Sequence, residues 1–165
     1  MKHIVMVIGG GGFFFQSVSL LGKLNAANRI RLAVPTDSLQ MIPEIEKRLQ
    51  RRFEIVRIPP VTTIASSAVS RALNFVKCIR AALAMLHSDR PDLVVTVASS
   101  LAVPIFLAAK LLGIKTVYID SITRVNQAST TGRLLSKFKL ADRFYVQWPE
   151  AVTLYKGAVY KGTVL

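Results

Sequence analysis

The sequence has a single cysteine and two histidines, and both scarcities restrict the chemistry it can perform. Cys78 lies on an apolar helical pattern, which argues against a disulfide framework or a zinc site and predicts core packing in a reducing compartment. His3 falls within the predicted first strand and His87 at the end of a long helix, so neither is placed for general-base chemistry at a strand's carboxyl end. We therefore expect neither a metal site nor histidine-driven catalysis.

The sequence also lacks a long unbroken apolar run, although 52% of its 165 residues are hydrophobic and only 19% are charged. Lys77, Arg80, Lys110 and Lys115 interrupt the apolar runs before they reach the roughly 20 residues of a membrane-spanning helix. The amino-terminal run MKHIVMVIGGGG is short and leads into glycines instead of a cleavage site, so it is predicted to be a strand. The length fits one domain over residues 1–165.

Acidic residues are few, and their scarcity points to an anionic partner. Nine acidic residues stand against 22 basic ones, which gives a formal charge of +13. Nucleic acid, a nucleotide, a diphosphate lipid and an anionic membrane leaflet all fit this charge, which alone does not choose among them. Zinc-finger spacing, an RNP-like aromatic pattern and a block of basic residues are all missing, so we expect no nucleic-acid binding.

Strand and helix patterns alternate along the chain. Predicted strands or extended pieces cover residues 4–8, 29–34, 53–58, 92–97, 116–119, 143–146 and 158–160. Predicted helices cover residues 13–26, 42–52, 66–86, 101–112, 131–138 and 149–155, and residues 35–38 form a predicted turn. This order predicts an α/β fold, namely a Rossmann-like parallel sheet with helices on both faces.

A glycine run, Gly9 to Gly12, follows the first predicted strand. It lets the backbone approach a ligand closely and exposes amide donors, which suits a phosphate or a sugar hydroxyl. The run matches neither a Walker loop nor GxGxxG with an acidic residue at the end of the second strand, which disfavours a stand-alone nucleotide-binding protein. A tight turn without any ligand is the alternative interpretation.

The most informative segment runs from Arg90 to Gln127. RPDLVVTVASSLAVPIFLAAKLLGIKTVYID predicts a buried strand, a helix and a second strand, and the polar run SITRVNQ follows. Open parallel α/β sheets bind ligands outside the carboxyl ends of their strands. The polar residues at these two strand ends are Ser99, Ser100, Asp120, Ser121, Thr123 and Arg124.

Asp120 is the carboxylate best placed to act as a base or to bind a sugar hydroxyl. Arg124 is close enough in sequence to pair with Asp120 or to hold a diphosphate as a planar donor. In the alternative interpretation Asp120 and Ser121 only cap the next helix and Arg124 is a solvated surface residue. Ser99 and Ser100 fit either ligand hydrogen bonds or a helix cap, and no serine lies in a GxSxG elbow.

Several sequence blocks have a familiar form. They are PDLVVTVASSLAVPIFLAAKLLGIKTVYIDSITRV, STTGRLL, ADRFYVQW and AVYKGTVL. With these blocks the chain closely resembles the bacterial PssD, EpsE and CpsF type proteins of exopolysaccharide synthesis. Those proteins are similar to the membrane-associated subunit of the eukaryotic dolichol-linked N-acetylglucosaminyltransferase. The resemblance covers nearly the whole chain and is weakest over residues 39–70.

The resemblance implies half of a MurG-like GT-B glycosyltransferase, namely the Rossmann-like amino-terminal domain that binds the acceptor. A separate small subunit, PssE-like or EpsF-like, is then expected to hold the UDP-sugar donor, and this chain is expected to need no cofactor. The implied acceptor is a polyprenyl-diphosphate-linked saccharide of exopolysaccharide or capsule synthesis, at the cytoplasmic face of the plasma membrane, with this chain bound peripherally. A non-catalytic accessory protein that anchors a partner glycosyltransferase is the alternative.

The family's glycine loop has the form SGGHLTQ, and the corresponding run here is GGGGFFFQ. Phe13 stands where the family has histidine, so this chain lacks the residue that a histidine-based mechanism needs. Asp120 keeps a carboxylate where relatives commonly have glutamate, and our hypothesis is that it acts as the catalytic base of a direct displacement. The implied acceptor-binding residues are Gly11, Gly12, Phe13, Gln16, Ser99, Ser100, Ser121, Thr123 and Arg124.

Overall fold

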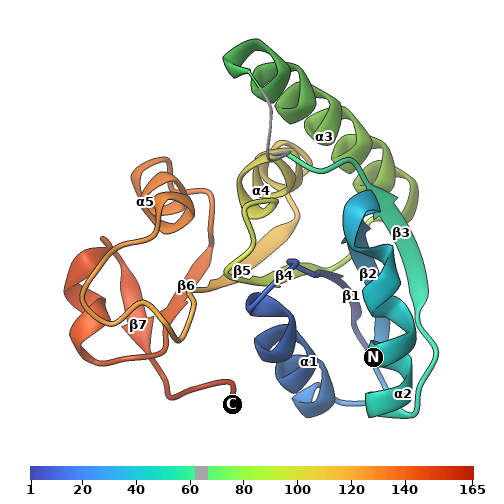
Figure 1. The fold of residues 1–165 in the computed structure, drawn as a ribbon, viewed down its shortest axis with the longest axis horizontal. Coiled ribbons are helices and arrows are strands. Elements are labelled where there is room, and N and C mark those ends of the chain that lie inside the picture. The colour runs from blue at the N-terminus through green and yellow to red at the C-terminus, as the bar shows by residue number, and fades with distance from the viewer. Residues whose placement is uncertain (62–66) are drawn as a thin grey trace.

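One parallel sheet runs through the computed structural model (Figure 1). The structure describes residues 1–61 and 67–165, and within these the sheet has seven strands in the order β3-β2-β1-β4-β5-β6-β7. Every neighbouring pair is parallel. The strands are β1 (His3–Val7), β2 (Arg29–Pro35), β3 (Glu54–Ile58), β4 (Leu93–Val97), β5 (Lys115–Ile119), β6 (Arg143–Val146) and β7 (Ala158–Tyr160).

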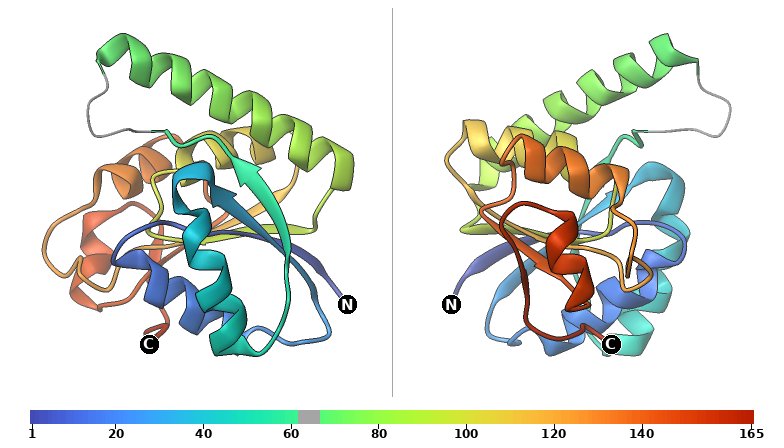
Figure 2. Two further views of the ribbon diagram at one scale, coloured as in Figure 1. Left: turned by 45° about the vertical axis from the view of Figure 1, so that its right-hand side comes forward. Right: turned by 90° about the vertical axis from the view of Figure 1, so that its left-hand side faces the viewer.

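Helices cover both faces of this sheet, as the alternating pattern predicts (Figures 1 and 2). Two helices, α1 and α2, lie on one face, and α3, α4 and α5 lie on the other. The α-helices are α1 (Phe13–Lys23), α2 (Ile42–Leu49), α3 (Ala68–Asp89), α4 (Ala102–Leu111) and α5 (Thr130–Lys137). Two short 3-10 helices are η1 (Thr36–Met41) and η2 (Glu150–Leu154).

The central strands are mainly apolar because both of their faces are buried, and the hydroxyl of the buried Thr96 in β4 donates to the carbonyl of Val7. In and just after β1, Val5 and Val7 pack into the core beneath α3 and α4, whereas Met6 and Ile8 pack into the core beneath α1. Alternate residues of a strand point to opposite faces, so one short run supplies two cores. Cys78 of α3 is fully buried in the first core, which confirms its predicted packing role.

The strand order reverses between β1 and β4. From β1 the chain moves outward through β2 and β3, and then returns to place β4 on the other side of β1. In open α/β sheets the loops separate at such a switch point and leave a crevice at the carboxyl ends of the strands. The loop after β1, with its glycine run, and the loop after β4, with Ser99 and Ser100, border this position.

Tertiary contacts move several predicted boundaries. Residues 35–38 do not form a simple turn, because β2 continues to Pro35 and η1 follows directly. Ser66, the predicted first residue of the long helix, lies outside the described residues, and α3 runs from Ala68 to Asp89. Its last turn continues beyond the predicted end because Asp89 forms ion pairs with Arg29 and Arg31 at the amino edge of the sheet. No helix of residues 1–61 and 67–165 combines the length and apolar character that crossing a bilayer requires.

Candidate functional site

Two adjoining pockets lie at the carboxyl edge of the sheet, and together we call them the crevice. The larger has a volume of about 270 Å³ and the smaller about 130 Å³. Both pockets are lined by Gly9 and Gly10 after β1 and by Ser99 and Ser100 after β4. The larger pocket is further lined by Phe13, Ala98, Asp120, Ser121, Arg124, Ser129, Thr130 and Thr131. The smaller is further lined by Pro35, Asp37, Ser38, Pro60, Val61 and Leu101.

The loop after β1 approaches its neighbours so closely that a side chain at either of two positions would displace a neighbouring residue. A Cβ atom on Gly9 would lie 3.2 Å from the Cβ of Ser99, and one on Gly10 would lie 3.0 Å from Oγ of Ser38. Gly11 and Gly12, the predicted binding glycines, face open space and lead into α1, and neither lines the crevice. The close approach therefore belongs to Gly9 and Gly10, which precede the positions inferred from the family loop.

Three helices begin at this edge, and their amino termini make it favourable for anions. The first turns of α1, α4 and α5 contain no acidic residue, so the positive ends of α1 and α4 are not neutralised by their own side chains, whereas the carboxylate of Asp120 accepts from Ser129 at the start of α5. No side chain caps the first turn of α1, where the amide of Phe14 donates to the carbonyl of Gly11 at 3.1 Å. Arg124 adds a cation to the same pocket wall. A phosphate or diphosphate group suits this combination of donors.

Asp120 is buried, with 1% of its surface exposed, and its carboxylate accepts hydrogen bonds from three hydroxyl groups. The hydroxyls of Tyr118 and Ser129 donate at 3.2 and 3.1 Å, and the hydroxyl of Tyr155 donates to Oδ2. Burial, together with the nearby Asp120, raises the pKa of Tyr155 to about 12 and that of Tyr118 as well, so both phenols stay protonated as donors. This set of partners anchors the carboxylate in the wall of the crevice.

Arg124 does not pair with Asp120, which was one of the two roles that its position in the sequence allowed. Among the ion pairs of the described residues none joins these two side chains, because the hydroxyl donors occupy the carboxylate. The amide of Arg124 instead donates to the carbonyl of Ser121 at 3.0 Å. Its half-buried side chain lines the larger pocket, which leaves the guanidinium available to a ligand.

The remaining predicted residues divide between the pocket wall and its support. Phe13, Ser99, Ser100 and Ser121 line the larger pocket. Thr123 is exposed outside both pockets, and its hydroxyl lies 2.9 Å from that of Ser121.

Gln16 is buried and does not line either pocket of the crevice. Only 3% of its surface is exposed, and its amide hydrogen-bonds to the hydroxyl of Ser121, the backbone of Ile122 and the side chain of Gln147. It therefore lies behind the wall of the crevice. Its helix position showed that it is near the loop but not which way its side chain points.

Sequence reasoning did not select Asp37, the one carboxylate of the smaller pocket. Asp37 is exposed, and one of its oxygens accepts a hydrogen bond from the hydroxyl of Ser38 at 3.0 Å. The signal was present, since Asp37 follows the carboxyl end of β2 just as Asp120 follows that of β5. We did not select Asp37 because residues 35–38 were predicted to form a turn.

The family model described as "Oligosaccharide biosynthesis protein Alg14 like" matches residues 4–164. The chain belongs to this Alg14-like family. It is 31% identical to the human protein named UDP-N-acetylglucosamine transferase subunit ALG14, over 98% of this chain and 82% of that protein. A relative with the same name from Candida albicans is 28% identical over 99% of this chain and 78% of that protein. Membership confirms the predicted likeness to the eukaryotic N-acetylglucosaminyltransferase subunit.

Solved structures show the same fold for the Alg14-like chain. MurG of Acinetobacter baumannii superposes with a TM-score of 0.77 at 18% identity, over 100% of this chain and 46% of that chain. The UDP-GlcNAc 2-epimerase of Neisseria meningitidis superposes with a TM-score of 0.70 at 12% identity, over 98% of this chain and 47% of that chain. The Alg14-like chain thus spans about half the length of these proteins. The predicted MurG-like, GT-B amino-terminal fold is confirmed, and because an epimerase shares it, the fold alone does not select a reaction.

Proposed function

We propose that this chain is the acceptor-binding, membrane-associated subunit of a two-component glycosyltransferase. The proposed reaction moves a sugar from a UDP-sugar to a polyprenyl-diphosphate-linked saccharide, and the names of the relatives point to N-acetylglucosamine as the sugar. The observation that carries the proposal is the crevice, where glycine amides, serine hydroxyls and Arg124 line one pocket in a chain of the Alg14-like family. The resemblance to PssD-type proteins supports the finer proposal of an acceptor from exopolysaccharide or capsule synthesis.

The proposed chemistry is a direct displacement. A hydroxyl oxygen of the acceptor sugar bonds to the anomeric carbon of the UDP-sugar, the bond from that carbon to the UDP oxygen breaks, and UDP leaves with the electron pair. The amides of the glycine loop and Arg124 hold the acceptor diphosphate, because planar guanidinium and backbone donors match phosphate oxygens. The hydroxyl proton passes to a carboxylate.

Two carboxylates of the crevice compete for that proton. Asp120, the candidate from the sequence, already accepts from three hydroxyls, and a carboxylate has about four acceptor sites. Asp37 accepts from one hydroxyl and is exposed. We therefore propose Asp37 for proton transfer and Asp120 as the anchor that shapes the acceptor pocket.

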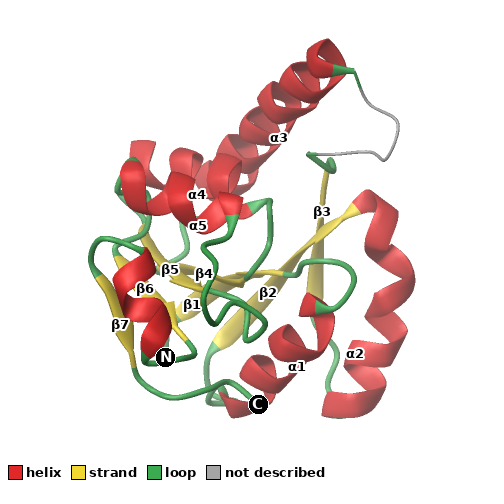
Figure 3. Ribbon diagram, turned by 60° about the vertical axis from the view of Figure 1, so that its left-hand side comes forward, coloured by secondary structure: helices red, strands yellow, loops and turns green. Residues whose placement is uncertain are grey.

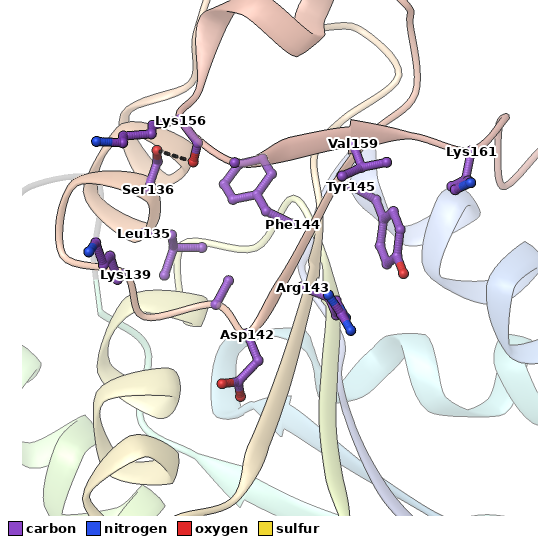
Figure 4. A pocket seen from close by; sticks show the side chains of 12 residues that line it. Leu135, Ser136, Lys139, Asp142, Arg143, Phe144, Tyr145, Lys156, Val159 and Lys161 are labelled. Carbon is purple, nitrogen blue, oxygen red and sulfur yellow. Dashed lines mark hydrogen bonds between the residues drawn. The ribbon is translucent and has the colours of Figure 1, made fainter.

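The partner subunit requires a surface, and a pocket separate from the crevice offers one (Figure 4). It has a volume of about 660 Å³ and lies against β6, β7 and the end of α5, away from the crevice. Val159 contributes exposed apolar surface, with the buried Leu135 and Phe144 behind it. The surrounding charged residues are Lys139, Asp142, Arg143, Lys156 and Lys161. Because β7 is an edge strand with Val159 44% exposed, we propose that an apolar and acidic segment of the small donor-binding subunit, PssE-like or EpsF-like, docks here.

The membrane contact is assigned to the amino-terminal half of α3, which extends beyond the body of the protein (Figures 2 and 3). Val69, Leu73 and Val76 recur at helical spacing there and are 70%, 56% and 53% exposed. Arg71 and Lys77 are exposed on the same stretch. An apolar stripe beside cations favours adsorption to an anionic leaflet, and we propose peripheral binding at the cytoplasmic face of the plasma membrane.

The test is a reconstitution with a panel of UDP-sugars and a polyprenyl-diphosphate-linked acceptor in vesicles. Transfer is measured for this chain alone, for the small subunit encoded with it alone, and for the mixture. Transfer only in the mixture establishes the two-component enzyme and identifies the donor. Equal transfer by the small subunit alone makes this chain the accessory anchor, a second candidate that the replacement of histidine by Phe13 favours.

A further inference from the structure

Gln147 follows β6 directly and is buried, with 2% of its surface exposed. Its Nε2 donates two hydrogen bonds of 2.8 Å, one to Oε1 of Gln16 and one to the backbone carbonyl of Asp120. Its Oε1 accepts from the backbone amide of Val164 at 2.9 Å. Both amide hydrogens and the carbonyl oxygen of Gln147 therefore have partners within the protein.

Gln16 carries the chain of hydrogen bonds onward to the crevice. Its Oε1 also accepts from the backbone amide of Ile122 at 2.9 Å, and its Nε2 donates to Oγ of Ser121 at 3.3 Å. Ser121 lines the larger pocket, and its carbonyl holds the amide of Arg124. The loop from Ser121 to Arg124 is thus supported from behind by a side chain of α1.

At its other end the chain of hydrogen bonds reaches residues 161–165, which we call the tail segment. The segment leaves β7 and ends beside α1 (Figures 1 and 3). Val164 is 9% exposed and packs into the core beneath α1. Its carbonyl accepts from Nζ of Lys23 at 2.8 Å and from the hydroxyl of Ser19. The segment is therefore held through both the N–H and the carbonyl of Val164.

The side-chain amides of Gln16 and Gln147 have only one orientation that satisfies three neighbouring backbone groups. The N–H of Val164 and the N–H of Ile122 each need an oxygen, and the carbonyl of Asp120 needs a donor. These requirements turn Oε1 of Gln147 toward the tail segment and Oε1 of Gln16 toward the crevice loop. If the N–H of Val164 is removed, Oε1 of the buried Gln147 loses its hydrogen-bond donor, so the Gln147 side chain is held only through Nε2 and its contact with Gln16 weakens.

We propose that Gln147 and Gln16 are positioning residues that transmit the docking of the tail segment to the crevice loop. Neither residue touches the acceptor, and both act through Ser121 and Ile122, which they hold in place for acceptor binding. The consequence for acceptor binding rests on the function proposed above, whereas the coupling between tail and loop is a property of this chain alone. Gln16 thereby acquires a role other than the ligand contact expected from the family loop.

The first test measures hydrogen exchange of the Ile122 amide by NMR, without any substrate. Gln147→Met keeps the length of the side chain and removes its hydrogen bonds, and a chain of residues 1–163 removes the Val164 amide. Both should accelerate exchange of the Ile122 amide at least about tenfold, the size expected when a buried hydrogen bond is lost. Thr163→Ala, in the tail segment, and Ile105→Val, in the core of α4, are controls that change neither amide and should leave this exchange near its original rate.

A double-mutant cycle tests whether the two glutamines act together. Gln16→Met and Gln147→Met should each accelerate exchange of the Ile122 amide, and the double variant should exceed the stronger single variant by less than about twofold. Full multiplication of the two effects overturns the proposal. Unchanged exchange in both Gln147→Met and the 1–163 chain, with the fold retained, overturns it as well.

The second test is kinetic and uses farnesyl-diphosphate-linked N-acetylglucosamine as acceptor with the reconstituted two-subunit enzyme. Gln147→Met should raise the KM for this acceptor at least about fivefold while the KM for the UDP-sugar and kcat stay within about twofold, the pattern of lost acceptor positioning. Accelerated exchange with an unchanged acceptor KM overturns the link to binding. If the wild-type pair transfers no sugar, the proposed function fails, and the exchange measurements still decide whether the tail is coupled to the loop.

Discussion

The hydroxyl of Tyr155 donates to the carboxylate of Asp120 although the two residues lie 35 positions apart in the sequence. The same hydroxyl accepts from the backbone amide of Ser129 at 2.6 Å, directly before α5. Tyr155 thus joins the loop after β5, the start of α5 and the segment after η2 at one buried point. The wall of the crevice is therefore formed by a contact between distant segments.

Removing this hydroxyl should destabilise the protein. Tyr155→Phe leaves Asp120 with two hydroxyl donors and the Ser129 amide without its partner, so we expect a loss of about 1–3 kcal/mol in the free energy of unfolding. Denaturant unfolding measures the change. Tyr160→Phe, at a 39% exposed position, is the matched control and should be neutral. A Tyr155→Phe variant as stable as the wild type would show that the hydroxyl adds nothing to the anchor.

Replacing each carboxylate of the crevice separates the base from the anchor. Asp37→Asn should leave stability nearly unchanged, because the side chain is exposed, and should lower kcat of the two-subunit enzyme by about 10²–10⁴-fold, the usual contribution of a general base. Asp120→Asn should lower stability and transfer together, because its amide group adds donors where three hydroxyls donate. The exposed Glu150→Gln is the control. Full transfer by Asp37→Asn, with transfer abolished in an assembled Asp120→Asn complex, would return the base role to Asp120.

Two glycine substitutions distinguish the close approach from the turn. Gly9→Ala places a Cβ atom 3.2 Å from that of Ser99, so we expect displacement of the serine loop and a weaker affinity for the acceptor. Gly12→Ala meets no atom within 4 Å and has φ of −62°, so it should keep acceptor affinity and add about 0.4–1 kcal/mol of stability through the unfolded chain. The acceptor KM and unfolding curves measure both effects. A larger effect on KM at Gly12 would restore the family-loop assignment.

Vesicle binding tests the proposed membrane surface of α3. Leu73→Ser should weaken binding to anionic vesicles at least about tenfold, since burying a leucine in the interface contributes on the order of 1.5–3 kcal/mol. Leu111→Ser is the control, because Leu111 is 68% exposed at the end of α4, outside the proposed surface. Cosedimentation with phosphatidylglycerol vesicles and with neutral phosphatidylcholine vesicles measures both variants. Equal weakening by the two substitutions would contradict the assignment to α3.

Assembly with the small subunit tests the pocket at β7. Val159→Asp puts a charge at the centre of the proposed interface and should weaken assembly at least about tenfold, because an unpaired charge buried at an interface is costly. Lys161→Glu reverses one of the surrounding charges and should slow association, with the difference shrinking at high salt. Analytical ultracentrifugation and binding kinetics measure these changes. The assignment fails if Val159→Asp assembles as tightly as the wild-type chain.

Local sequence patterns predicted the bounds of a strand correctly where these bounds depend on that strand's own residues. The apolar strand Arg143–Val146 and the short piece at residues 158–160 have their predicted bounds, and the pairing of the latter with β6 became visible only in the sheet. The site was partly predictable because polar residues after β4 and β5 meet at the same sheet edge, and Ser99, Ser100 and Ser121 line the pocket as expected. Asp37 escaped because its strand end was interpreted as a turn.

By itself the sequence determined the alternating α/β order, the cationic surface and the family, since these follow from short-range periodicity, composition and sequence blocks. Only the tertiary structure decided that Asp120 is held by hydroxyls instead of Arg124, and that the buried Gln16 hydrogen-bonds to the backbone of Ile122 in the crevice loop. The physical reason is that the partners of a buried polar group are set by strand order and packing. Gln16 meets Gln147 across 131 residues, a proximity that no local pattern encodes.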